Sequence, residues 1–255
     1  MPMHGQIDGL SEEFEDYLNG LIISDGYLEK TGAFLQIFAP RYFDWVSEVY
    51  TRFTSEGILC DVTYSNGVGG FGGNQDFFRV RTKTYDLFKH LRNVWYTYDK
   101  KRPIDNLRFS PAFIASWYHG DGQIKKDSSI TLHTNSFDRN EVEALADKFP
   151  EIGIGAWCKE YDKKNQPGQF VVVIRANDSE RFMEYIEPYK VPCFDYKYNT
   201  TTTMHNKKWL DWERHLLYDN YGITPVADIS KRLNRSLSSI YHEASRCYIN
   251  GRGGS

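Results

Sequence analysis

The chain has little cysteine, no long apolar run and no pronounced excess of one charge. Its four cysteines (Cys60, Cys158, Cys193 and Cys247) are scattered, without a Cys-x-x-Cys pair. This spacing excludes the common zinc motifs and favours free thiols in a reducing compartment. No apolar stretch approaches the roughly 20 residues of a membrane span, and the first residues lack the pattern of a secretion signal. We therefore expect a protein of a bacterial or phage-infected cytoplasm, or of an organelle matrix, that is neither secreted nor membrane-bound.

The net charge of −3 excludes a uniformly basic nucleic-acid binder, but the charge is unevenly distributed. Residues 79–126 hold eleven Lys and Arg against four Asp and Glu, and residues 197–252 hold nine against five. Phosphate attraction acts over a Debye length of about 8 Å, so local basic patches matter more than net charge. Ordinary solvated surfaces give the same pattern. The charge therefore permits nucleic-acid binding without indicating it.

Two nonapeptides about a hundred residues apart share one pattern, an apolar helical run that ends in Asp-Gly. They are LNGLIISDG at 18–26 and IASWYHGDG at 114–122. Alignment of the two copies pairs these residues: Asp25 with Asp121, Gly20 with Ser116, and Ser24 with Gly120. Small residues four positions apart share a helical face and let two helix backbones approach closely. We therefore expect the two helices to pack together and to bring both aspartates side by side.

Such a pair of aspartates is unfavourable without a ligand. A helix C-terminus carries partial negative charge, and two neighbouring carboxylates repel each other and raise one pKa. A hard divalent cation with oxygen ligands reverses both effects. The sequence therefore predicts a Mg²⁺ site at Asp25 and Asp121. Gly26, the last residue of the first motif, is expected in the left-handed conformation that ends helices.

The paired motifs resemble those of a LAGLIDADG homing endonuclease of the single-chain, two-motif type. The resemblance covers about residues 10–200, and the second copy has the longer match, which continues at 132–137, 141–143, 186–189 and 196–197. Both motifs depart from the consensus. Ile23 and His119 occupy its first acidic position, and Ser24 occupies its alanine, but the terminal Asp-Gly is intact in each.

The resemblance implies site-specific, metal-dependent cleavage of double-stranded DNA by an intron-encoded enzyme. A metal-activated water would attack the phosphodiester and leave 3′ overhangs. Mn²⁺ could substitute for Mg²⁺, and Ca²⁺ would support binding without cleavage. The implied metal ligands are the following: Asp25, Asp121, and the backbone carbonyls of Ser24 and Gly120.

The resemblance also implies a basic residue near each metal site. Lys197 matches the position after the last helix of the second half. Lys101 matches the position ahead of the second motif, although Lys100 and Arg102 fit that place with a shift of one residue. Asp25, Asp121, Lys101 and Lys197 are thus the expected catalytic residues.

Apolar periodicity predicts the element order αββαββα twice. This is an α+β fold of two pseudo-symmetric halves, 1–98 and 99–199, whose four-stranded sheets form a saddle for a DNA groove. Strand alternation points Ile130 and Leu132 to the core and leaves the other face for DNA. The residues expected to contact DNA from the sheets are Arg79, Arg81, Gln36, Lys125, Thr131 and His133. The glycine-rich segment 66–73 is expected to be a hairpin tip.

A polar stretch at 200–208 precedes a third region, 205–250, with three apolar helical patterns. Helix, turn and helix at this length resemble a helix-turn-helix DNA reader. A generic three-helix bundle gives the same apolar pattern. The outward-facing set expected to contact DNA is Arg235, Ser238, Ser239, His242 and Arg246.

Two alternatives of the same fold remain open. An intron RNA maturase would bind its own RNA, and intron RNA is therefore a possible partner. A transcription regulator would pair a degenerate LAGLIDADG fold with a helix-turn-helix. Regulators of that type have lost the motif acids, whereas this chain keeps Asp25 and Asp121, which favours the enzyme. We expect a monomer that acts on double-stranded DNA.

Overall fold

The computed structural model describes residues 9–65, 76–134, 136–161, 168–198, 209, 211–233, 235 and 237–251. The first half contains the following elements: α1 (Glu12–Ile23), β1 (Tyr27–Leu28), β2 (Phe34–Phe38), η1 (Pro40–Tyr42), α2 (Phe43–Ser55), β3 (Cys60–Ser65), β4 (Phe77–Thr82) and α3 (Asp86–Trp95). A small hairpin follows, made of β5 (Tyr96–Thr97) and β6 (Lys100–Lys101).

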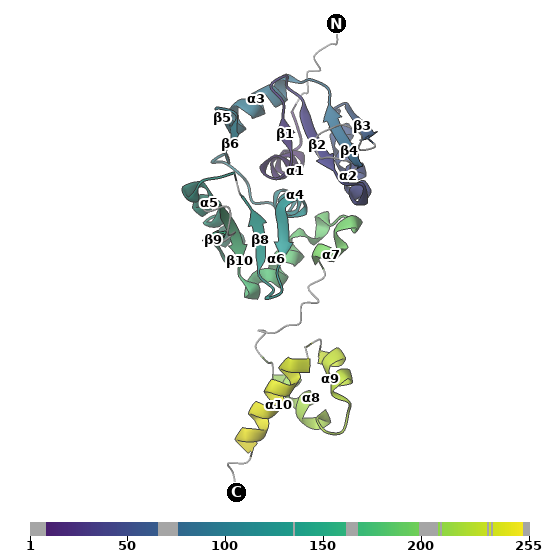
Figure 1. The fold of residues 1–255 in the computed structure, drawn as a ribbon, viewed down its shortest axis with the longest axis vertical. Helices are drawn as coiled ribbons and strands as arrows, with labels where there is room; N and C mark the ends of the chain where they lie inside the picture. The colour runs from purple at the N-terminus through teal and green to yellow at the C-terminus, as the bar shows by residue number, and fades with distance from the viewer. Residues whose placement is uncertain are drawn as a thin grey trace.

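The second half repeats the order of the first (Figure 1). It contains the following elements: α4 (Pro111–Asp121), β7 (Gly122–Ile124), β8 (Ile130–His133), α5 (Arg139–Ala146), η2 (Phe149–Ile152), β9 (Ala156–Glu160), β10 (Phe170–Ile174), η3 (Ala176–Asp178), α6 (Ser179–Ile186), η4 (Glu187–Tyr189), η5 (Pro192–Phe194) and α7 (Asp195–Tyr198). Three more helices follow: α8 (Asp211–Asn220), α9 (Val226–Leu233) and α10 (Leu237–Gly251).

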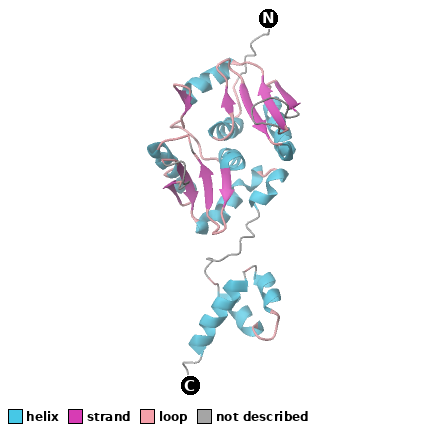
Figure 2. Cartoon of the chain, viewed as in Figure 1, coloured by secondary structure: helices cyan, strands magenta, loops and turns pink. Residues whose placement is uncertain are grey.

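The two halves have the same sheet topology. The strand orders are β1-β2-β4-β3 and β7-β8-β10-β9, and all pairs are antiparallel. The register also matches, because Tyr27 pairs with Leu35 and the aligned Gln123 pairs with Thr131. Figure 2 shows the two four-stranded sheets as separate groups of strands with helices around them. The predicted α+β fold of two pseudo-symmetric halves is confirmed.

Helices α1 and α4 pack directly against each other at the centre of the two halves (Figure 1). A Cβ on Gly20 would lie 2.3 Å from the Phe113 carbonyl oxygen and 2.6 Å from the Ser116 Cβ. A Cβ on Gly120 would lie 2.6 Å from the Ser24 Cβ. Only glycine fits at such distances, so the small residues predicted to share this contact are the ones that make it.

Local sequence fixes where these helices begin. The Ser11 side chain accepts a hydrogen bond from the Phe14 N–H at 3.3 Å, and Ser110 caps α4 in the same way. Pro111 stands in the first turn of α4, where a missing N–H costs nothing. These caps set the first residue of each motif helix, and the aspartate follows at the opposite end.

The described residues form two hydrophobic cores. The larger runs from Phe14 to Tyr198 and is shared by both halves. The smaller belongs to α8, α9 and α10 and contains these buried residues: Trp209, Leu217, Ile229, Leu233, Ile240 and Ala244. Within the described ranges, no helix is both long and apolar enough to cross a membrane.

The prediction of a left-handed backbone at Gly26 is wrong, since the φ angle of this residue is not positive. A glycine is required here because there is no space for a side chain: a Cβ would lie 2.6 Å from the Leu21 carbonyl oxygen and 2.7 Å from the Phe34 ring. The expected hairpin tip at 66–73 lies outside the described residues.

Candidate active site

The two motif aspartates meet where α1 and α4 end. Asp25 is exposed and Asp121 is half-buried, and a Cβ on Gly120 would lie 3.5 Å from Asp25 Oδ2. Burial, and next the neighbouring Asp25, raise the pKa of Asp121 to about 7. Although the surface of Asp25 is exposed, the protein atoms packed around its carboxylate reduce its hydration and raise its pKa, against the opposing charges of Lys101 and Lys197. The pair therefore binds protons more readily than free carboxylates do, and a cation at this place would stabilise the charged form.

Lys101 reaches this pair from the β5–β6 hairpin. Its Nζ donates to the carbonyl oxygens of Ser24 at 2.8 Å and Gly26 at 3.0 Å. Burial lowers its pKa to about 8, while Asp121 and Asp25 act in the opposite direction. The ammonium thus partly neutralises both the negative helix end and the carboxylates.

Lys197 holds the corresponding position on the second motif. It lies on the short helix α7, and its Nζ donates to the carbonyl oxygens of Tyr118 at 3.1 Å and His119 at 2.7 Å. Burial lowers its pKa to about 8, against the raising effect of Asp121 and Asp25. At the end of each motif helix, backbone carbonyls therefore accept hydrogen bonds from a lysine, at the position that the resemblance implied.

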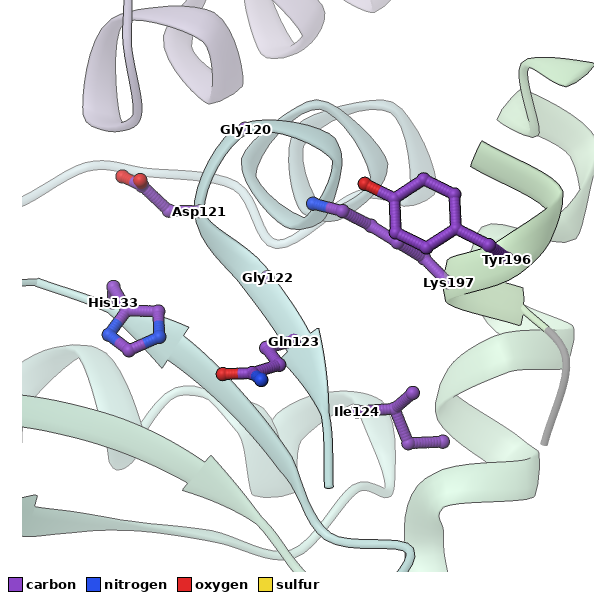
Figure 3. Close-up of a pocket in the computed structure, with 8 residues that line it drawn as sticks. All are labelled: Gly120, Asp121, Gly122, Gln123, Ile124, His133, Tyr196 and Lys197. Atoms are coloured by element: carbon purple, nitrogen blue, oxygen red, sulfur yellow. The ribbon is translucent and has the colours of Figure 1, made fainter. Parts of the chain in front are cut away.

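A cavity of about 430 Å³ adjoins Asp121. Figure 3 shows Gln123 and His133 on adjacent strands below Asp121, with Tyr196 and Lys197 reaching from α7. Sequence reasoning missed Gln123 and Tyr196. The available signals were the position of Gln123 two residues after Asp121 and the position of Tyr196 beside Lys197.

The donor set fits a cation that is shared with ligands from outside the chain. Among the residues that the structure describes, no group of three or more His, Cys, Asp and Glu could hold a metal ion alone. Two carboxylates supply hard oxygen donors suited to Mg²⁺, which keeps several water or phosphate ligands. The Ser24 carbonyl, expected as a further ligand, is engaged by Lys101, whereas Gly120 lines the cavity.

Comparison with known proteins assigns the chain to a family. The model of the LAGLIDADG DNA endonuclease family matches residues 16–182. The chain belongs to the LAGLIDADG DNA endonuclease family. The expectation of a homing endonuclease, an enzyme that cuts DNA, is thereby confirmed.

Relatives of the endonuclease are distant in sequence. A probable intron-encoded endonuclease of Wickerhamomyces canadensis is 26% identical over 74% of this chain and 84% of that protein. An uncharacterized protein of Methanocaldococcus jannaschii is 26% identical over 81% of each chain. In fold, the endonuclease is similar to the homing endonuclease I-WcaI bound to its DNA recognition sequence, with a TM-score of 0.61 and 21% identity over 74% of this chain and 87% of that one.

In the first sheet of the endonuclease, Arg79 and Arg81 lie on the face away from the core. Arg79 is exposed, and its Nε donates to Thr63 Oγ1 at 3.2 Å. Arg81 makes a two-bond ion pair with Glu29 at 2.9 and 2.7 Å. The prediction for Gln36 is wrong, because this side chain faces the core and is 1% exposed.

The second sheet is less open than expected. His133 and Lys125 are half-buried, and the His133 ring meets Tyr161 edge-on at 5.3 Å. Thr131 lies on the predicted face but is fully buried, as are Val171 and Val173 beside it. The expectation that Thr131 contacts DNA is therefore wrong for this structure, because its strand neighbours cover it.

In the three-helix tail, Arg235 is not an outward-facing residue. Its guanidinium lies 4.3 Å from the Trp209 ring and pairs with Glu213 at 3.0 and 2.8 Å, and it is 2% exposed. The prediction of DNA contact by Arg235 is wrong, because its buried ion pair with Glu213 links α8 to the turn before α10.

The other tail residues expected to contact DNA have different outcomes. Arg246 is about half-exposed and pairs with Glu243 at 2.6 Å. Ser239 is half-buried, and the side chains of Ser238 and His242 lie outside the described part. The helix-turn-helix assignment of the tail stays a prediction.

Proposed function

We propose that the endonuclease cuts double-stranded DNA at a specific site as a monomer, with Mg²⁺ held between Asp25 and Asp121. The observation that carries this proposal is the meeting of two motif carboxylates at the ends of packed helices, each beside a lysine. When bound, the metal supplies a water of lowered pKa and stabilises the leaving 3′ oxygen. A nucleophilic serine or cysteine is not needed.

The chain's own groups then bind and orient the DNA. Asp25 and Asp121 would hold the cation, which would supply positive charge at the scissile phosphates. Lys101 and Lys197 place an ammonium beside each phosphate, where a fixed positive charge stabilises negative charge that develops in the transition state. With a pKa of about 8, each lysine is mostly protonated at neutral pH.

The outer faces of the two sheets are proposed to read the major groove on both sides of the cut, which would leave 3′ overhangs. Arg79 is the best-placed contact of the first sheet, because it is exposed and makes no ion pair among the described residues. Arg81 is oriented by Glu29, and His133 borders the cavity at Asp121. The similarity in fold to I-WcaI, a homing endonuclease bound to its DNA recognition sequence, supports this role for the sheets.

We further propose that α8, α9 and α10 form a helix-turn-helix-like module that adds DNA affinity. Its own hydrophobic core supports an independent unit. Lys231 and Arg232 are exposed on α9 and suit phosphate contact.

The aspartates provide the test. A duplex substrate is first selected from a plasmid library of the gene's own flanking sequences, joined across the presumed intron insertion point. We expect Asp25→Asn and Asp121→Asn each to abolish double-strand cutting in Mg²⁺ while the variants still bind this duplex in Ca²⁺. Mn²⁺ should support wild-type cutting. The neutral amide removes repulsion at a helix C-terminus, so thermal stability should hold or rise slightly.

The outcomes separate the proposal from its alternatives. Slow nicking of one strand by a single variant is compatible with two carboxylates that share a site. Unchanged cleavage by the double Asn variant excludes the mechanism. A wild-type protein that binds intron RNA tightly and cuts no duplex would be an RNA maturase instead.

A further inference from the structure

His119 occupies the first acidic position of the second motif and takes no part in the mechanism above. The side chain is 2% exposed, and its ring stacks on Phe194 with 4.5 Å between centroids and 7° between planes. Its Nε2 lies 2.8 Å from the Tyr198 hydroxyl. Trp45, from the first half, meets the ring edge-on at 6.1 Å. The imidazole is therefore fixed on several sides.

The residues that hold His119 flank Lys197 in the sequence. Phe194 directly precedes α7, and Tyr198 is its last residue. A helix of four residues has no stability of its own, so its position depends on tertiary contacts. Tyr118 adds a contact through its hydroxyl, which donates to the Lys197 carbonyl oxygen at 2.7 Å. The end of α4 thus holds α7 on both sides of Lys197.

We propose that His119 is a positioning residue that fixes α7 and thereby places the Lys197 ammonium beside Asp121. This inference rests on the proposed function, which assigns Lys197 to a scissile phosphate. Phe194 supplies the apolar contact with the imidazole, and Tyr198 supplies the directional one. An aspartate at position 119, as in the motif consensus, would bring a third carboxylate into this apolar contact at the cost of burying an unpaired charge.

In the first half, ion pairs and not an imidazole contact position the lysine. Ile23 stands at the position aligned with His119. The hairpin that carries Lys101 is held through Asp99, which pairs with Arg92 at 2.6 Å and with Lys30 at 2.6 Å. Because only Lys197 depends on the imidazole contact, loss of that contact should affect one DNA strand more than the other.

Three variants and a control test this inference on the duplex that the wild-type enzyme cuts. His119→Phe keeps an aromatic ring over Phe194 but loses the bond to Tyr198, and Tyr198→Phe removes the same bond from the other side. Lys197→Ala identifies the strand that depends on Lys197. Tyr85→Phe is the control, since it removes a buried hydroxyl that accepts from the Leu59 N–H at 2.8 Å in the first half.

The measurement is single-turnover cleavage with each strand labelled separately, together with Kd in Ca²⁺ and the melting temperature. A displaced catalytic group can cost a factor of about 10 to 100 in rate. We expect His119→Phe and Tyr198→Phe to slow by about tenfold or more the same strand that Lys197→Ala slows. The other strand and Kd should change less than about twofold, and Tyr85→Phe should leave both strands unchanged. The double variant His119→Phe/Tyr198→Phe should be no slower than either single variant, because both remove one bond.

Each contrary result has a distinct meaning. If Lys197→Ala slows neither strand, the role of Lys197 in the proposed function is wrong. If Lys197→Ala slows the cleavage of one strand while Tyr198→Phe slows neither strand, the positioning role of His119 is overturned. It is also overturned if Tyr198→Phe slows both strands equally, with a matching loss of stability. Additive effects of the two single variants would also contradict it.

Discussion

Gln36 is a polar side chain inside the apolar core, on the inner face of β2 beside Val80 of β4. Its amide nitrogen and oxygen have no hydrogen-bond partner among the described residues. The aligned position in the second half, by the shared register, is Leu132. A buried amide without a partner loses its bonds to water and gains none in return. The residue therefore costs stability without contributing to the DNA-facing surface.

We expect Gln36→Leu to raise the free energy of unfolding by about 1–3 kcal/mol, the desolvation cost of an unpaired polar group. Urea denaturation measures this change, and the cleavage rate should stay at the wild-type value because the side chain faces the core. The matched control is Leu132→Gln, which should destabilise the protein. A loss of cleavage by Gln36→Leu in a stable protein would give Gln36 a functional role after all.

Among the helices, the contact between α1 and α4 determines whether the two aspartates lie side by side. Gly→Ala in a helix interior normally stabilises a protein by up to about 1 kcal/mol. At Gly20 the added Cβ would lie 2.3 Å from a backbone carbonyl oxygen, which cannot move as a flexible side chain can. We expect Gly20→Ala to lower the free energy of unfolding by about 1–3 kcal/mol, as overpacked cores do, and to slow cleavage.

The compensating variant gives the control for this prediction. Ser116→Gly removes the second atom near the new Cβ, so Gly20→Ala/Ser116→Gly should recover part of the missing stability. Thermal melting and cleavage assays would detect both effects. A stabilised Gly20→Ala variant with full activity would show that the helices can separate without consequence.

Sequence predicted the element order, the motif helices and the lysine positions, because each depends on local spacing or on a resemblance carried by short motifs. It did not predict the orientation of β2, since Leu35 and Ile37 are as apolar as Phe34 and Phe38 and no alternation marks the core face. The prediction that Arg235 faces outward is wrong for another reason. Its partner Glu213 lies 22 residues away, and no local pattern shows that a charged residue is buried with a distant partner.

Along the whole chain, the segment between the halves is anchored alternately to each of them. Asp99 pairs with Arg92 in the first half, and Arg102 pairs with Asp138 and Glu141 in the second at 2.9 and 2.6 Å. Arg108 then forms an ion pair with Asp16 of α1 at 2.9 Å, and Lys148 of the second half donates to the carbonyl oxygens of residues 105 and 107. The connection therefore fixes the relative position of the sheets, which agrees with the proposal that one chain supplies both aspartates.

The three-helix tail has a hydrophobic core of its own, and its removal tests whether it binds DNA. The chain should be cut after Tyr198, since Tyr198 is 8% exposed, belongs to the larger core and contacts His119. We expect the truncated enzyme to stay folded and metal-dependent but to bind its duplex more weakly. The slope of log K against log salt concentration should become shallower by about 0.9 for each phosphate that the tail neutralises in the full-length enzyme.

A full-length control assigns the change to specific cations. Lys231→Ala and Arg232→Ala remove two exposed charges from α9 and should each account for about 0.9 of the slope if they bind phosphates. Binding is measured in Ca²⁺ over a range of salt concentrations, so that cleavage does not deplete the duplex. An unchanged slope after truncation would mean that α8, α9 and α10 bind no phosphate, and the proposed role of the tail would be wrong. Retained cleavage in that same truncated protein would at the same time leave the two-motif active site intact as the catalytic unit.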